Sequence, residues 1–164
     1  MKDVTNKEQV INDLISLFCR IGPEMHCKSD SISTEILKDN LSKLGMDYGF
    51  DSRPNKTESE FLFDLTWFKK SNNEFHSIEN VVLILESEWK KDFYQIQYDF
   101  EKLLVANVPY KVIAFQTDDS FETTTNKIKT IINSFKGIDN NIFILAGFVN
   151  SIGTFQIETY QKII

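Results

Sequence analysis

The sequence predicts an α/β protein of three layers, in which a mixed β-sheet is covered by helices on both faces. The alternation of two kinds of segment along the chain supports this prediction. Segments with apolar residues at helical spacing alternate with short segments rich in Phe, Val, Ile and Leu, which is typical of helices and of strands buried on both faces. The chain has 164 residues, of which 41% are hydrophobic, so one domain spanning residues 1–164 is expected.

Two helices are expected at the start of the chain. Apolar residues at helical spacing predict the first from Thr5 to Arg20, and Gly22-Pro23 would end it. The second is expected from Ser31, as its capping residue, to Leu44, with Gly45 as the stop signal.

The next three segments are expected to be strands. The first is a short alternating segment from Met46 to Arg53, followed by a turn at Pro54-Asn55. The second runs from Glu60 to Phe68, and the third from Val81 to Glu88. The polar stretch between the second and third is expected to connect them as a hairpin centred near residue 75.

The remaining elements alternate between helices and strands. A helix from Asp92 to Ala106 is followed by a strand from Tyr110 to Gln116. Asp119 and Glu122 have the spacing of a capping box and predict a helix to Phe135. The two last strands, expected to form a hairpin, are Asn141 to Val149 and Thr154 to Tyr160.

Two carboxylates stand at the end of the most apolar strand. Glu86 and Glu88 directly follow the aliphatic run that begins at Val81. Residues two apart in a strand point to the same face, roughly 7 Å apart along the chain. Acidic side chains rarely end a core strand unless a partner offsets their desolvation, and a divalent cation or a nearby lysine is such a partner.

A third acid is expected beside them. Asp64 interrupts the apolar segment Phe61 to Phe68, and a hairpin centred near residue 75 places Asp64 opposite Glu86. Directly opposed residues have Cβ atoms about 5 Å apart. Asp64, Glu86 and Glu88 would then converge and repel one another unless a cation is bound or one acid is protonated. Ligands that are all oxygen favour Mg²⁺ or Mn²⁺.

The order helix, three strands, helix, strand, with these acids in the second and third strands, resembles the PD-(D/E)xK nuclease superfamily. That resemblance implies a restriction-endonuclease-like αβββαβ core, here with an additional N-terminal helix and a C-terminal helix and β-hairpin. It also implies that Asp64 and Glu86 hold a catalytic Mg²⁺. Glu88 stands where the family's lysine usually lies. The alternative register takes Glu88-Trp89-Lys90 as the E-x-K motif, but Glu86 better matches a position opposite Asp64.

The resemblance suggests three further candidates. Glu35 is the candidate for the acid on the first core helix. Lys90 shares the strand parity of Glu86 and reaches the site if the strand continues that far. Lys102 is the candidate for a lysine displaced onto the following helix, but its helical position is nearly opposite the buried face, which favours a solvated surface lysine. Trp67 and Trp89 are expected to lie in the core or at its rim rather than to stack on nucleobases.

The resulting hypothesis is a Mg²⁺-dependent nuclease that acts on DNA or RNA. Its competitor is a catalytically inactive protein of the same fold that acts as an interaction or regulatory module. The formal net charge of −6 argues against tight non-specific binding to nucleic acid through the chain alone. A domain of 164 residues has little room for sequence-reading elements, so a nuclease of this size is expected to need a homodimer or a protein partner. Because no membrane span or signal peptide is visible, we expect a cytoplasmic protein without a membrane partner.

Overall fold

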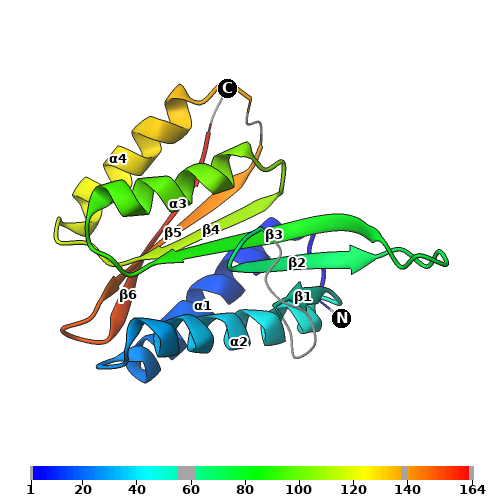
Figure 1. Ribbon diagram of the computed structural model, residues 1–164, viewed down its shortest axis with the longest axis horizontal. Helices are drawn as coiled ribbons and strands as arrows, with labels where there is room; N and C mark the ends of the chain where they lie inside the picture. Colours follow the sequence, from blue (N-terminus) through cyan, green and yellow to red (C-terminus); the bar gives the residue numbers. More distant parts are fainter. Residues whose placement is uncertain (1, 55–61, 138–139, 163–164) are drawn as a thin grey trace.

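One mixed β-sheet organises the part of the chain that the structure describes, residues 2–54, 62–137 and 140–162 of a computed structural model (Figure 1). These residues form an α/β fold with four helices and six strands. The strands lie side by side in chain order, which is β1 (Asp51–Arg53), β2 (Leu65–Lys70), β3 (Ile78–Glu88), β4 (Tyr110–Phe115), β5 (Ile142–Val149) and β6 (Thr154–Gln161).

The direction of the strands changes across the sheet. The first three are antiparallel, β3, β4 and β5 are parallel, and β6 returns antiparallel to β5. The parallel pairs are joined by α3 (Phe93–Val105) and α4 (Phe121–Ser134). The carboxyl ends of β3, β4 and β5 therefore meet at one edge of the sheet, where loops can gather functional side chains.

Helices cover both faces of the sheet, as the sequence predicts. On one face lie α1 (Lys7–Met25) and α2 (Asp30–Asp47), and on the other lie α3 and α4 (Figure 1). Alternate residues of β3 accordingly enter different cores. Leu83 and Leu85 pack on the α1/α2 side, whereas Ile84 packs on the α3/α4 side. Within the described residues, no helix combines the length and the apolar character needed to cross a membrane.

The hairpin of β2 and β3 has its centre where the sequence predicts it. Leu65 pairs with Leu85 and Thr66 with Ile84. Asp64 lies just before this ladder, in a bend, and not in a strand pair with Glu86. The hairpin projects beyond the other strands at its turn (Figure 1). The second strand begins later than expected, at Leu65. Residues 60 and 61 of the predicted strand and residue 55 of the predicted turn lie outside the described residues.

Two glycines that the sequence suggests as stop signals lie inside helices. The first helix continues through Gly22-Pro23 to Met25, and the second continues through Gly45 to Asp47. Both glycines allow close packing. A Cβ atom on Gly22 would lie 2.7 Å from the carbonyl oxygen of Gly153, and one on Gly45 would lie 2.8 Å from Trp67 Nε1.

The predicted helix caps are displaced by one or two residues. Ser29, not Ser31, caps α2, because its side chain accepts from the backbone N–H of Ile32. Ser120 caps α4 by accepting from the N–H of Thr123 at 3.1 Å. Asp119, the expected cap, instead binds Lys127 at 2.6 Å.

The remaining bounds differ from the expectations in smaller ways. The predicted strand from Met46 to Arg53 is reduced to β1, because α2 runs on to Asp47. The third strand starts earlier than expected, at Ile78, and ends at Glu88 as predicted. The final hairpin is present, with its turn between Val149 and Thr154.

Candidate functional site

Glu86 is a buried acid near the carboxyl end of β3. Its residue is only 2% exposed, and its Oε2 accepts from Lys102 Nζ at 2.9 Å. Its Oε1 is buried and has no hydrogen-bond partner among the described residues. Burial raises the pKa of Glu86 to about 7, opposed by the hydrogen bond from Lys102 and reinforced by the charge of Asp64. A buried carboxylate oxygen without a partner is costly unless a further group binds it.

Asp64 is fixed at the neighbouring strand end. Its Oδ2 accepts from the backbone N–H of Ser87 at 2.8 Å and from the Ser87 hydroxyl at 2.6 Å. Its Oδ1 lies 4.0 Å from Lys38 Nζ of α2. Its contact with Ser87, the residue after Glu86, places Asp64 near Glu86, and its charge helps to raise the pKa of Glu86.

Lys102 belongs to this site, contrary to the prediction of a solvated surface lysine. Its ammonium contacts Asp99 Oδ1 at 2.7 Å as well as Glu86. Residue 102 does lie away from the buried face of α3, as expected. Its long flexible side chain nevertheless reaches Glu86 near the end of β3. Burial lowers the pKa of Lys102, but the hydrogen bonds to Asp99 and Glu86 outweigh it and hold the pKa above its ordinary value.

Asp99 is the residue of the site that sequence reasoning missed. It lies on α3, pairs with Lys102, and lies close enough to Glu88 to help raise the pKa of that carboxyl. Its only sequence signal is the three-residue spacing from Lys102, which allows an ion pair on a helix. That spacing is common on solvated helices, so it does not by itself indicate a site.

Glu88 is half-buried and turns toward different partners from Glu86. Its Oε1 accepts from the backbone N–H of Lys90 at 2.7 Å. Burial raises the pKa of Glu88; the hydrogen bond from Lys90 lowers it, and the hydrogen bond with Asp99 raises it. β3 ends at Glu88, and Lys90 follows it as an exposed residue. The backbone N–H of Lys90, not its ammonium, contacts the Glu88 carboxylate.

Glu35, the candidate acid on the first core helix α2, does not contact the site. Glu35 is exposed and shares no hydrogen bond or ion pair with Asp64 or Glu86, all three of which lie in the described part of the chain. The α2 residues near the site are Lys38 and Thr34, and the Thr34 hydroxyl accepts from Trp89 Nε1 at 2.7 Å. Trp89, like Trp67, is buried, as predicted for a core residue.

The expected set of three converging carboxylates is not preformed. In the described residues, no three histidine, cysteine, aspartate or glutamate side chains are placed to hold one metal ion. Two neighbouring carboxylates remain, those of Asp64 and Glu86, and Glu86 offers an oxygen without a partner. Mg²⁺ commonly binds through one or two carboxylates and completes its octahedron with water and substrate phosphate, so this pair fits such an ion.

Comparison with known proteins does not indicate the chemistry of this site. No family model matches it, and comparisons with curated proteins and with solved structures gave no significant match. The geometry therefore carries the assignment. It brings together two neighbouring acids, a lysine whose pKa lies above its ordinary value and a supporting aspartate near the end of β3. Such a combination is suited to binding a cation and an anionic group together.

Proposed function

We propose that this protein is a Mg²⁺-dependent nuclease-like protein that hydrolyses phosphodiester bonds of nucleic acid. The observation that carries the proposal is the unpartnered Oε1 of Glu86, buried near Asp64 at a strand end. Buried carboxylate oxygens without a partner are rare and costly, and carboxylates with strongly shifted pKa values cluster at functional sites. A cation bound there would satisfy the free oxygen and offset the repulsion between the two acids.

The arrangement of elements supports a restriction-endonuclease-like core for this function. The order α2, β1, β2, β3, α3, β4 is the αβββαβ order that the resemblance implies, with antiparallel strands followed by a parallel pair. The two core helices lie on opposite faces of the sheet. In this proposal α1, α4 and the β5–β6 hairpin are additions to that core.

Each polar residue of the site has a role in the proposed reaction. Asp64 and Glu86 would hold Mg²⁺, which supplies positive charge for a phosphate oxygen and lowers the pKa of a bound water. Glu88, with a raised pKa and beyond the metal pair, would orient the attacking water. Ser87 keeps Asp64 in position through two hydrogen bonds.

Lys102 takes the role of the family's lysine in this proposal, in preference to Lys90. Its pKa lies above the ordinary value, so it stays protonated at neutral pH and is not a general base. It would orient Glu86 and stabilise negative charge that develops on the phosphate. Asp99 positions the ammonium for both tasks.

A specific observation favours the alternative, an inactive nuclease-fold protein that binds another protein. The Lys102 ammonium already satisfies one oxygen of Glu86, as a structural ion pair would. In addition, α3 exposes large apolar and aromatic side chains near this pair, namely Tyr94, Tyr98 and Val105. Such side chains are enriched at protein interfaces.

Calorimetric titration with Mn²⁺, followed by a cleavage assay on single- and double-stranded DNA and RNA, tests the proposal. We expect saturable binding and Mn²⁺-dependent cleavage in the wild type. Glu86→Gln and Asp64→Asn should abolish both. Lys102→Met should keep metal binding and reduce cleavage by about a hundredfold or more, as loss of one electrostatic group in an active site does.

Matched controls make the assay specific. Glu79→Gln changes an exposed acid on the same strand, far from its carboxyl end, and should leave binding and cleavage unchanged. Lys127→Met removes an exposed lysine that pairs with Asp119 and should also have no effect. Because some nuclease metals bind only with the substrate phosphate, the titration is repeated with a non-cleavable phosphorothioate oligonucleotide. Absence of binding in both titrations would support the interaction module instead.

A further inference from the structure

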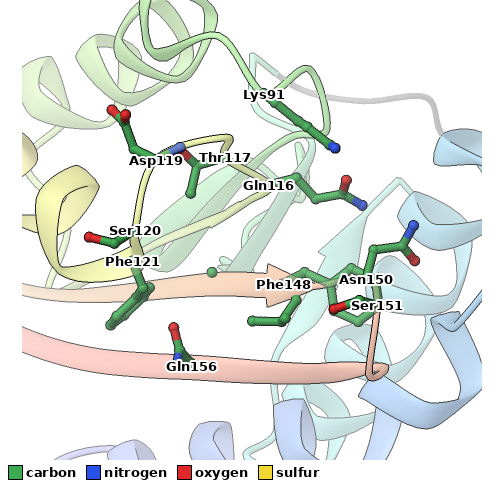
Figure 2. A pocket seen from close by; sticks show the side chains of 12 residues that line it. Lys91, Gln116, Thr117, Asp119, Ser120, Phe121, Phe148, Asn150, Ser151 and Gln156 are labelled. Carbon is green, nitrogen blue, oxygen red and sulfur yellow. The ribbon is translucent and has the colours of Figure 1, made fainter.

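A pocket of about 480 Å³ opens at the edge of the sheet where the parallel strands end (Figure 2). Its walls come from the loop after β4 and the start of α4 on one side, and from the end of β5 and the following turn on the other. Lys91, which follows β3, lies at its rim. None of its lining residues belongs to the carboxylate site described above.

The pocket is lined by polar groups whose hydrogen-bonding capacity is unused. Three carboxamides line it, those of Gln116, Asn150 and Gln156, together with the Ser151 hydroxyl. None of these four side chains has a recorded hydrogen bond to a described residue. Asn150, Ser151 and Gln156 are exposed and Gln116 is half-buried, so their donors and acceptors are open to a ligand. Unused donors and acceptors converging on a concavity indicate a polar ligand.

Aromatic surface accompanies the carboxamides. Phe121, which is half-buried, and Phe148, which is mostly buried against Trp89 and Phe155, both line the pocket (Figure 2). A Cβ atom at position 147 would lie 2.5 Å from Phe121 Cδ2, so the phenyl ring occupies its position only because residue 147 is glycine. A ligand with a flat apolar body and polar edges would match both kinds of wall.

The charges of the pocket disfavour a bare phosphate as its ligand. Lys91 lies at the rim, but its ammonium is 3.4 Å from the Asp118 carboxylate. Asp119 also lines the pocket and pairs with Lys127. Positive and negative side chains thus balance, whereas the unpaired groups are neutral amides, which present a donor and an acceptor together as the edge of a nucleobase requires.

The pocket and the carboxylate site share one edge of the sheet. Glu88 pairs with Phe115, and Phe115 with Gly147, so the end of β3 and the pocket floor lie at the same level. Adjacent strands are about 4.8 Å apart, which sets the two about 10 Å from each other. A short nucleic-acid strand along this edge can therefore reach both.

We propose that this pocket binds one unpaired nucleobase of the nucleic-acid substrate and so selects the position of cleavage. The identity of the ligand rests on the proposed function, and the location of the site rests on the pocket alone. Gln116 and Asn150 would read the base edge, and Phe121 would contact its plane.

Nuclear magnetic resonance titration in EDTA tests the pocket without relying on catalysis. The protein, carrying Glu86→Gln, is titrated with each of the four nucleoside 5′-monophosphates and with ribose 5-phosphate, which lacks a base. We expect saturable shifts of backbone amides within residues 116–121 and 147–156 for at least one nucleotide. Gln116→Ala and Asn150→Ala should weaken that binding about fivefold or more, whereas Asn72→Ala, at an exposed position outside the pocket, should not.

The outcomes separate this inference from the proposed function. Equal binding of ribose 5-phosphate, or no saturable binding of any nucleotide, would overturn the nucleobase site. Single-stranded DNA and RNA hexanucleotides should bind more tightly than the mononucleotides; the reverse order would identify a free nucleotide as the ligand and overturn the substrate assignment. Nucleotide binding without cleavage refutes only the nuclease. Cleavage with an unchanged KM and unchanged site preference in Asn150→Ala refutes only the pocket.

Discussion

Glu86 is a buried acid that retains one carboxylate oxygen without a hydrogen-bond partner among the described residues. Its carboxylate lies in an apolar environment that raises its pKa to about 7, so near neutral pH it exchanges readily between protonated and ionised forms. Lys102 compensates one oxygen only. The other oxygen has no partner among the described residues, and the proposal of a metal site rests on that oxygen.

Lys111 is the second buried ionisable residue, and it has a different environment. It lies on β4 with no exposed surface, and its Nζ is 3.5 Å from the Leu104 carbonyl oxygen and 5.1 Å from the centre of the Phe143 ring. With its amide turned to satisfy both neighbours, Asn141 accepts from Lys111 Nζ at 3.2 Å. No carboxylate within the described residues pairs with this ammonium, so burial lowers the pKa of Lys111 to about 8.

Replacement of Lys111 by Met should stabilise the protein in a pH-dependent way. Because the pKa is lower in the folded than in the unfolded chain, the wild type carries the full cost of burying the charge below pH 8. That cost disappears as the pH rises from about 8 to 10.5. Lys111→Met should therefore increase the free energy of unfolding by about 1–3 kcal/mol at pH 7, and by less than about 1 kcal/mol at pH 10.

Urea unfolding at both pH values measures this difference. Lys43→Met, which changes an exposed lysine on α2, is the control and should alter stability by less than about 0.5 kcal/mol at either pH. A gain for Lys111→Met that grows between pH 7 and pH 10 would contradict the assigned direction of the pKa.

At the scale of elements, two opposing effects meet where α2 packs on β2. Gly45 weakens the helix by its conformational freedom, and alanine would favour it by about 1 kcal/mol. Trp67, however, lies against this glycine and donates from Nε1 to the Leu41 carbonyl oxygen at 3.0 Å. The indole is fully buried and cannot retreat without disturbing the core around Tyr48 and Phe50.

Gly45→Ala should therefore destabilise the protein despite the better helix propensity of alanine. A new Cβ atom would lie 2.8 Å from Trp67 Nε1, and overpacking of this kind costs about 1–3 kcal/mol. We expect a net loss of about 1–2 kcal/mol in chemical unfolding. Lys43→Ala, on the exposed side of the same helix, should leave stability nearly unchanged; equal or greater stability of Gly45→Ala would show that the indole yields easily.

At the scale of the whole molecule, one sheet separates two hydrophobic cores. Trp67 and Trp89 belong to the core under α1 and α2, and Ile113 belongs to the core under α3 and α4. Both cores are built from alternate residues of the same strands. Loss of packing on one face should therefore weaken the strands on which the other face depends, and the described fold should unfold in one transition.

Ile113→Ala tests this coupling. The substitution removes buried methyl groups on the α3/α4 face, and should lower stability by about 2–5 kcal/mol. Tryptophan fluorescence, which reports the opposite core, and far-ultraviolet circular dichroism should show the same shift in unfolding midpoint. Ile152→Ala, at a mostly exposed turn position, should shift neither. Divergence of the two probes in Ile113→Ala would show that the faces unfold separately.

Local signals predicted most of the elements and the register of the β2–β3 hairpin, which brings Asp64 near Glu86. Periodicity two in β2 and β3, and polar residues centred near residue 75, were sufficient for that register. Helix ends were less well predicted, because Gly22 and Gly45 resemble stop signals whereas packing across the molecule explains their presence. The three-carboxylate cluster also failed as a preformed site, since side-chain direction at the strand end depends on partners such as Asp99.

The sequence by itself determined the α/β class, the succession of helices and strands, and the acids at the strand ends, because these follow from the periods of apolar residues along a few successive turns or strands. Only the tertiary structure decided that Lys102 reaches Glu86, that Asp99 supports it, and that a pocket of carboxamides opens beside them. These arrangements join residues far apart in the chain, and they depend on how helices cross the sheet, which no local pattern encodes.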